Sequence, residues 1–455
     1  MSVLKENLTV GNNTINGYFP ARTTLAKEGE FDWEIAAAGV IRALYRKTTS
    51  ALLTKDYDGK KGCKLAYAVE QYKLLCKSQF DATLDEAEFW QVLEGMYFKN
   101  DEYLKLTPAA SLLKLVPLAK GAPQLRLSDL FVSMMGGYYL QDAKAPANNF
   151  IEQKLVDVLT STKVLEDISA KEAMSKGILE KPFLPYLSQA FKADIAFLSL
   201  HPNYLLEQLP NMLRLYAFLY TTQLALNIRG WAAAPSPKPF YFILENERAS
   251  RERKVLVNDG YQNAKRFFEY IFPYLAISEM LQDHTNASSG RRIPLWELAQ
   301  SLTEADKGRL KLFAKDFEKN RFGEQESELE VDSESALATI LELAHKQFAK
   351  GESRQAAGEK FLRTTEAEIC SSFAKARGNI GKIACLNQDY IALMTNLIIG
   401  EKDKLSLFEL LDGFKERGIC FDKQSVKGLI KYYERVGNVE KMSDSGDAIN
   451  VRKTI

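Results

Sequence analysis

Apolar residues recur three and four positions apart along most of the chain after residue 30. The spacing is clearest in residues 33–53 (WEIAAAGVIRALYRKTTSALL), 65–77, 86–98 and 128–135. Because residues at this spacing share one face of an α-helix, these windows predict helices that bury an apolar face. The sequence therefore predicts a mainly α protein with a multi-helical body.

The first predicted unit is an N-terminal helical domain over residues 1–145. Its first segment, LTVGNNTINGYF at 8–19, places β-branched and aromatic residues around Asn-Asn and Asn-Gly, which predicts a short β-like arm. Pro108, Pro117 and Pro123 limit the helices that follow. The stretch QDAKAPANN is the predicted exit from this unit.

Two further helical units follow. Residues 150–285 are rich in Phe, Tyr and Leu, which predicts an aromatic-rich helical domain with a thick core; a surface that stacks nucleobases is the alternative. Within it, WAAAPSPKPF at 231–240 predicts a proline-rich loop. Residues 290–385 form a predicted charged helical region.

The charge balance confines any nucleic-acid contact to a local patch. The chain has sixty Lys and Arg and fifty-nine Asp and Glu, so the formal net charge is only +1.

The five cysteines contain no CxxC pair, which favours reduced, mostly buried thiols over a zinc ribbon or a disulfide framework.

We also predict a cytoplasmic protein without a membrane partner. The N-terminus has no apolar core behind a basic start, as a signal peptide would. The longest uncharged apolar stretch, residues 215–228, is shorter than the ~20 residues that span a bilayer.

Residues 386–455 carry the clearest local pattern. Helices are predicted at 387–399, closed by Gly400, and at 405–417, followed by Gly418. A third helix begins after Asp422, a suitable N-cap, and ends at Gly437.

The third helix has two different faces. An apolar row is formed by Val426, Leu429, Ile430, Tyr433 and Val436. A basic stripe recurs every four residues and consists of Lys423, Lys427, Lys431 and Arg435.

Two short strands are predicted beyond this helix, at 439–442 and 448–451, around the turn at 444–447. Three helices and a terminal β-hairpin are the plan of a winged-helix module, whose third helix can enter a DNA major groove. Lys441, Arg452 and Lys453 would face the phosphate backbone from the wing. Docking of a protein is the alternative, because residues 401–455 contain eleven Lys or Arg and ten Asp or Glu.

The C-terminal fifty residues resemble the end of the DptG (DndG) proteins of the bacterial DNA phosphorothioation-dependent restriction system. The resemblance is carried by RGICFD at 417–422 and GNVEKMSDSGDAINVRK at 437–453. It implies a subunit of an antiviral restriction complex, with DptF-like and DptH-like ATP-using subunits as partners. It implies no catalytic residues.

No motif in the sequence assigns a catalytic or metal-binding residue, and none indicates a cofactor. Residues 378–383 (GNIGKI) lack the glycine spacing and the hydroxyl of a P-loop, so we interpret them as a turn between helices. The three histidines are far apart in sequence. A metal-dependent nuclease built from dispersed carboxylates, and a winged-helix transcription regulator, are the alternatives to a non-enzymatic subunit.

A second basic patch contains Arg248, Arg251, Arg253 and Lys254. Arginine suits phosphate because its planar fork donates two parallel hydrogen bonds. The competing interpretation is a helix surface on which these cations pair with Glu245, Glu247 and Glu252.

Overall fold

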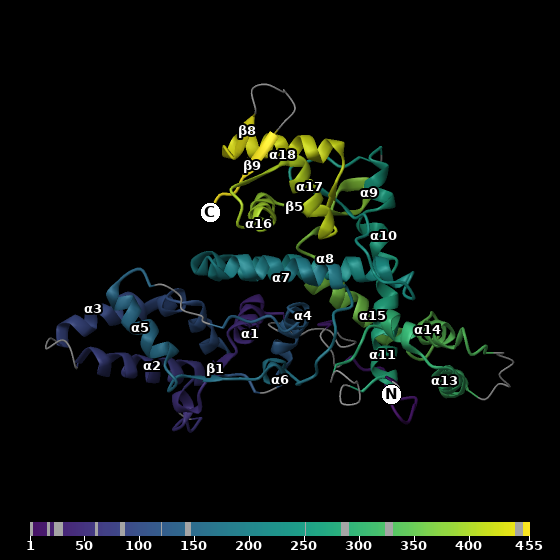
Figure 1. The fold of residues 1–455 in the computed structure, drawn as a ribbon, viewed down its shortest axis with the longest axis horizontal. Helices are drawn as coiled ribbons and strands as arrows, with labels where there is room; N and C mark the ends of the chain where they lie inside the picture. Colours follow the sequence, from purple (N-terminus) through teal and green to yellow (C-terminus); the bar gives the residue numbers. More distant parts are fainter. Residues whose placement is uncertain are drawn as a thin grey trace. The chain divides into compact units, whose positions relative to one another are not determined.

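The computed structural model describes most of the chain, and helices dominate it (Figure 1). The described residues are 3–15, 19–21, 31–59, 62–81, 87–119, 121–141, 147–250, 252–283, 291–323, 331–441 and 449–455. The chain divides into two compact units. We call residues 29–178 and 198–213 the N-terminal unit, and residues 1–28, 179–197 and 214–455 the C-terminal unit.

The N-terminal unit is built from helices and one small sheet. Its elements are α1 (Trp33–Tyr45), β1 (Lys47–Thr49), η1 (Ala51–Thr54), α2 (Lys64–Asp81), α3 (Ala87–Tyr97), η2 (Lys99–Lys105), η3 (Pro108–Leu115), η4 (Pro123–Leu125), α4 (Arg126–Met134), α5 (Phe150–Thr160), β2 (Leu165–Asp167) and α6 (Ala170–Ala173). The helices predicted at 65–77, 86–98 and 128–135 are confirmed as α2, α3 and α4.

The helix predicted at 33–53 is too long. Helix α1 ends at Tyr45, because Arg46 adopts the left-handed conformation with φ of 50° and closes the helix. The β-branched Thr48 and Thr49 then favour an extended backbone, and β1 pairs antiparallel with β2.

The C-terminal unit contains the longer helices and most of the strands. The helices are α7 (Pro185–Ser199), α8 (Pro202–Ile228), α9 (Lys254–Asn258), α10 (Tyr261–Lys265), η5 (Phe268–Tyr270), α11 (Ile271–Leu281), α12 (Leu295–Ser301), α13 (Glu304–Phe322), α14 (Ala336–Lys346), α15 (Gln355–Thr364), η6 (Thr365–Cys370), η7 (Gly378–Ile380), α16 (Gln388–Ile399), α17 (Leu407–Glu416) and α18 (Lys423–Val436). Helices α7 and α8 also contribute residues to the N-terminal unit. None of the described helices combines the length and the apolar character needed to cross a membrane.

The aromatic residues of the second predicted segment form a core. The ring of Phe218 on α8 lies 5.9 Å from Phe240, 5.9 Å from Phe242 and 5.0 Å from Phe373, measured between centroids. All these side chains are buried. Hydrophobic burial therefore accounts for this part of the aromatic pattern.

A mixed sheet that the sequence did not predict lies beside this core. Its strand order is β4 (Ala374–Ala376), β5 (Lys382–Leu386), β3 (Tyr241–Leu244) and β7 (Cys420–Phe421). Strand β3 is parallel to both β5 and β7, and β4 is antiparallel to β5. The GNIGKI stretch is thus the turn and the start of a β-hairpin, where positive φ angles at Gly378 and Gly381 reverse the chain, and not a turn between helices.

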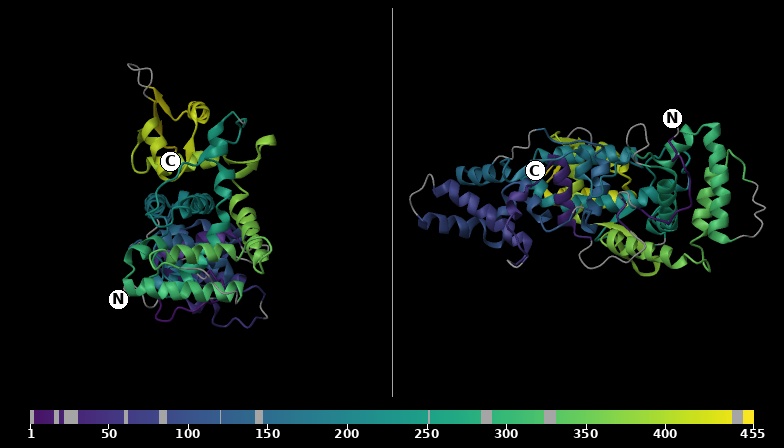
Figure 2. Two further views of the ribbon diagram at one scale, coloured as in Figure 1. Left: turned by 90° about the vertical axis from the view of Figure 1, so that its right-hand side faces the viewer. Right: turned by 90° about the horizontal axis from the view of Figure 1, so that it is seen from below.

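The N-terminal segment contacts helices of the same unit. Lys5 N–H donates to Leu281 O over 3.0 Å. The Arg309 guanidinium donates to Lys5 O and to Glu6 O, and Arg321 donates to Gly11 O. Figure 2 (right) shows this segment running beside α13. Described residues 3–15 contain no strand, and the Asn-Gly pair of the predicted β-like arm lies outside the described residues.

The last elements gather at the C-terminal end of this unit (Figure 1). Beside α16, α17 and α18 lies a sheet with the order β6 (Lys404–Ser406), β9 (Ile449–Arg452) and β8 (Val439–Lys441), in which neighbours are antiparallel. The helix predicted from residue 405 begins two residues later, because Leu405 and Ser406 belong to β6 and Ser406 forms a capping box with Glu409. The predicted turn at 444–447 lies outside the described residues.

Candidate nucleic-acid interface

Helix α18 is fixed at both ends by the residues that the sequence indicated. The Asp422 carboxylate accepts from Ser425 N–H over 2.9 Å, and Gly437 ends the helix in the left-handed conformation with φ of 82°. Both signals are local, which is why they could be found in the sequence.

The buried face of α18 differs in part from the predicted apolar row. The buried residues are Ser425, Leu429, Tyr432 and Tyr433, whereas Val426 and Ile430 are half-buried and Val436 is 45% exposed. The prediction for Val436 was wrong: this residue is the last of the helix, and nearly half of it is exposed. Tyr433 is held by a hydrogen bond of 2.7 Å between its hydroxyl and that of Thr395 on α16.

The predicted basic stripe lies on the opposite side of the helix. Successive residues turn by about 100°, so positions 423, 427, 431 and 435 lie on average about 195° from the buried residues. Lys423, Lys427, Lys431 and Arg435 are all exposed. Within the described part of the chain, none of the three lysines is in ion-pair contact with an acidic side chain, and the Arg435 guanidinium lies 6.0 Å from the Tyr432 ring centroid.

The predicted wing cations have intramolecular partners. Arg452 forms an ion pair with Glu440, which also lies 2.6 Å from Lys404 Nζ. Lys453 Nζ donates to Gly400 O over 3.1 Å and lies 5.8 Å from the Phe197 ring centroid. The side chain of Lys441 lies outside the described residues.

In the second predicted patch, Arg253 is nearly buried among carboxylates. Its Nε and Nη2 atoms donate to the Asp422 carboxylate over 2.7 and 2.6 Å, and Nη1 donates to Glu247 over 2.8 Å. Burial would raise the pKa of Asp422, but hydrogen bonds from Arg253 and Ser425 outweigh it and lower that pKa. Glu247 is thus one of the pairing partners that the sequence suggested, whereas Asp422 was assigned only as a cap.

The Arg253–Asp422 pair brings the two predicted patches together. Arg253 is the N-cap of α9 and Asp422 is the N-cap of α18, so the two helices begin side by side. Lys254 and Lys423 are the first residues of these helices, and both are exposed. Arg248 is also exposed, and Arg251 lies outside the described residues. The exposed cations of the second patch therefore lie close to the start of the basic stripe on α18.

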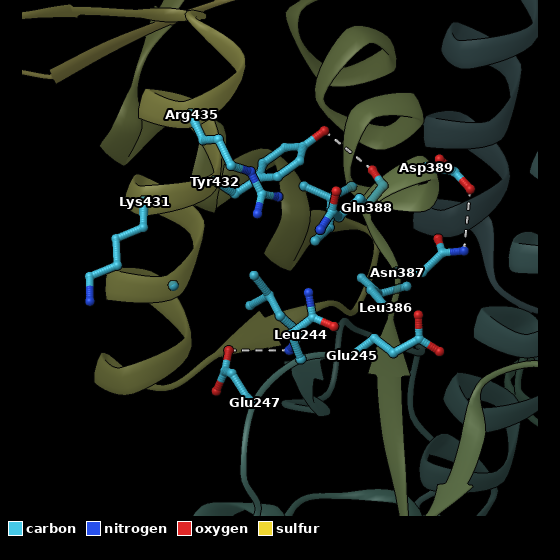
Figure 3. Close-up of a pocket in the computed structure, with 13 residues that line it drawn as sticks. Leu244, Glu245, Glu247, Leu386, Asn387, Gln388, Asp389, Lys431, Tyr432 and Arg435 are labelled. Atoms are coloured by element: carbon cyan, nitrogen blue, oxygen red, sulfur yellow. Dashed lines mark hydrogen bonds between the residues drawn. The ribbon is translucent and has the colours of Figure 1, made fainter.

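A hollow of about 410 Å³ lies along one flank of α18 (Figure 3). Parallel strands β3 and β5 end at this hollow, a position where ligands often bind in open α/β sheets. The lining residues are Leu244, Glu245, Asn246, Glu247, Leu386, Asn387, Gln388, Asp389, Ile391, Gly428, Lys431, Tyr432 and Arg435.

The hollow carries charges of both signs. Figure 3 shows Arg435 beside the Tyr432 ring, and the Tyr432 hydroxyl donates to Gln388 O over 3.3 Å. Glu245 and Asp389 are exposed carboxylates on the opposite wall. Because these acids repel phosphate, they restrict an anionic partner to the lysine side of α18.

The first and last residues of the string RGICFD, Arg417 and Asp422, both form ion pairs with distant parts of the chain. Arg417 is buried; its Nε donates to the Asp194 carboxylate over 2.9 Å, and its Nη1 donates to Gly413 O over 2.9 Å. The Tyr216 hydroxyl donates to the same carboxylate. At the other end, the Asp422 carboxylate accepts hydrogen bonds from Arg253. These two residues therefore hold α17 and α18 to the rest of the unit.

Among the described residues, no three His, Cys, Asp or Glu side chains are grouped closely enough to hold a metal ion. No protein-family model matches the chain, and no curated protein matches it.

Proposed function

We propose that this chain is a non-catalytic, cytoplasmic subunit of a phosphorothioation-dependent DNA restriction complex, and that it contacts DNA through a C-terminal winged-helix module. The order α16, β6, α17, β7, α18, β8, β9 supports the module, because three helices precede a terminal β-hairpin; the two-residue β7 is an addition to that plan. The observation that carries the DNA contact is the exposed row of Lys423, Lys427 and Lys431, which has no carboxylate partners in the described chain.

The charges around this row define where a phosphate backbone would lie. Lys254 and Arg248 extend the basic surface past the start of α18, whereas Glu245 and Asp389 bound it on the flank of the hollow. The wing contributes less, because Arg452 is neutralised by Glu440. We therefore assign the main phosphate contacts to α18 and the start of α9.

The assembly itself is proposed from the sequence resemblance. DptF-like and DptH-like ATP-using subunits are the expected partners, and this chain would connect them to DNA. One observation favours a protein contact close to the same module: Phe408, in the first turn of α17, is 72% exposed. A large apolar side chain at the surface is typical of a docking residue.

The test is a double charge reversal, Lys427→Glu with Lys431→Glu. Removing two phosphate contacts should weaken binding of duplex DNA at least tenfold and reduce the slope of log affinity against log salt by about 2. Fluorescence anisotropy with a labelled duplex, repeated at several salt concentrations, measures both quantities.

The matched control is Lys311→Glu with Lys315→Glu on α13, which reverses two exposed lysines at the same spacing. Its DNA affinity should stay within about twofold of the unmodified protein, with only a small general salt effect. Unchanged DNA affinity in the α18 variant would remove the proposed DNA contact. Loss of partner assembly in that variant would then assign the surface to protein docking.

A further inference from the structure

A second hollow, of about 640 Å³, lies in the C-terminal unit away from the residues discussed above. It is formed by the end of α8, the stretch from α10 to α11, and α14. Its lining residues are Ile228, Arg229, Trp231, Phe267, Tyr270, Pro273, Tyr274, Ala338, Leu341, Glu342 and His345. Four of these are aromatic side chains from two separate segments.

Tyr274 is buried, but the other three aromatic side chains of this hollow are not fully covered by internal packing. Tyr270 is 36% exposed, and Trp231 and Phe267 are partly exposed. The Tyr270 ring is stacked on the His345 imidazole, with centroids 4.0 Å apart and an interplanar angle of 9°. The Arg229 guanidinium lies over Phe267, so the ring area available to a flat ligand belongs mainly to Trp231 and Tyr270, which are partly exposed.

Polar groups of both signs line the same space. The exposed Arg229 guanidinium lies 6.0 Å from the Phe267 ring centroid, and Glu342 carries an exposed carboxylate. His345 Nε2 lies 3.7 Å from Glu269 Oε1, and burial lowers the pKa of this histidine. A neutral imidazole offers one donor and one acceptor.

We propose that this hollow binds a purine base that carries a phosphate. The base would stack on the exposed aromatic faces beside Trp231, Arg229 would pair with the phosphate, and Glu342 would accept from the amino or imino groups of the base. A cationic ligand fits less well, because the Arg229 guanidinium already lies over Phe267. The chemistry is shared by a free nucleotide and by a base of single-stranded DNA. This site does not depend on the function proposed for α18.

Three probes separate the possibilities: guanosine 5′-monophosphate, guanosine, and a single-stranded DNA of six nucleotides. Binding is measured by titration calorimetry with the full-length protein. Trp231→Ala should weaken binding about tenfold or more through lost stacking. Arg229→Gln should weaken the monophosphate but leave guanosine within about twofold. Arg266→Gln, which changes an exposed arginine outside the lining, is the control.

Binding of the monophosphate that shows both variant effects supports the proposal with a free nucleotide as ligand. Binding of the oligonucleotide alone, weakened by Trp231→Ala, supports it with nucleic acid as the source. No binding of any probe at millimolar concentration overturns it. Binding that Trp231→Ala leaves unchanged, in a variant whose thermal unfolding matches the unmodified protein, also overturns it.

Discussion

Arg417, which is buried, and Arg253, whose side chain is largely covered, hold α17 and α18 to the rest of the C-terminal unit. Each donates to a carboxylate that is far away in the sequence: Arg417 donates to Asp194, and Arg253 donates to Asp422. A buried ion pair contributes little over a well-packed apolar pair, but removing one partner leaves an unpaired charge in a medium of low polarity. These residues therefore act on stability and on the positions of α17 and α18.

Replacing Asp194 with Asn should be strongly destabilising, because the Arg417 guanidinium would remain buried without a counter-charge. We expect a loss of about 3–5 kcal/mol in the free energy of unfolding. Urea denaturation measures it, with Asp316→Asn at an exposed position of α13 as the control. A loss below about 1 kcal/mol would contradict the assigned role of the pair.

Asp129 in the N-terminal unit should make stability depend on pH. Burial raises its pKa to about 6, although hydrogen bonds from Ser175 and the charges of Arg126 and Arg42 oppose the shift. A raised folded-state pKa means that the folded chain binds the proton more tightly than the unfolded chain, so the stability contribution is lost as pH rises from about 4 to about 6.

The unmodified protein should therefore lose on the order of 2–3 kcal/mol relative to Asp129→Asn between pH 4 and pH 7, since one pKa unit corresponds to about 1.4 kcal/mol. Chemical denaturation at a series of pH values gives the difference. Asp56→Asn, at an exposed position, should show no such trend. A difference that is independent of pH would show that Asp129 is not titrating in this range.

At the level of residues, the sequence identified groups whose partners are close in the chain. Asp422 and Gly437 were found as helix ends because capping depends on the next few residues. Arg417 was missed as a functional or structural residue, since its partner Asp194 lies 223 positions earlier. Arg253 was placed in a phosphate-binding patch because nothing local indicated its contact with Asp422.

Close packing between helices sets the geometry of the C-terminal elements. A Cβ atom placed on Gly413 of α17 would lie 2.3 Å from Ile398 Cγ2 of α16, so only glycine allows this approach. Gly413→Ala should destabilise the protein by about 1–3 kcal/mol through overpacking. Differential scanning calorimetry measures the effect.

The same substitution at Gly308 of α13 is the control, because nothing lies within 4 Å of the added Cβ atom there. Gly308→Ala should stabilise the helix by up to about 1 kcal/mol, since alanine has the higher helix propensity. If both variants changed stability in the same direction, the close approach of α16 and α17 would not be the cause.

Helices were easier to predict than strands for a physical reason. The periodicity that defines α2, α3, α4 and α18 is contained within each segment. Strands β3 and β7 are only four and two residues long, and their parallel pairing joins residues 241 and 242 to residues 420 and 421. No local signal specifies such a partner, so the mixed sheet and the hollow at its edge could not be predicted.

Across the whole molecule, the C-terminal elements are not joined to the body by a flexible connection. Strand β7, between α17 and α18, pairs with β3, and Cys420 N–H donates to Phe240 O over 2.9 Å. The Arg417–Asp194 and Arg253–Asp422 pairs make the same connection through side chains. Residues 387–455 and residues 214–386 should therefore unfold together.

Separating the chain at this point tests that expectation. Residues 1–386 alone would bury Asp194 without Arg417 and leave β3 without β7, so we expect poor solubility or loss of the cooperative thermal transition seen for the full chain. Residues 387–455 alone should show weak protection of amide hydrogens in α18. Two fragments that each retain full-chain stability would contradict the shared sheet.

Arg253 and Asp422 are the N-caps of α9 and α18, and the contact between them fixes the start of α18 beside strand β3. A displacement of α18 would therefore reach β3, because Ser425 donates to Phe242 O and the Phe242 ring packs against Phe218. If DNA binds the lysine row as proposed, the environment of Phe218, far earlier in the sequence, should report that binding.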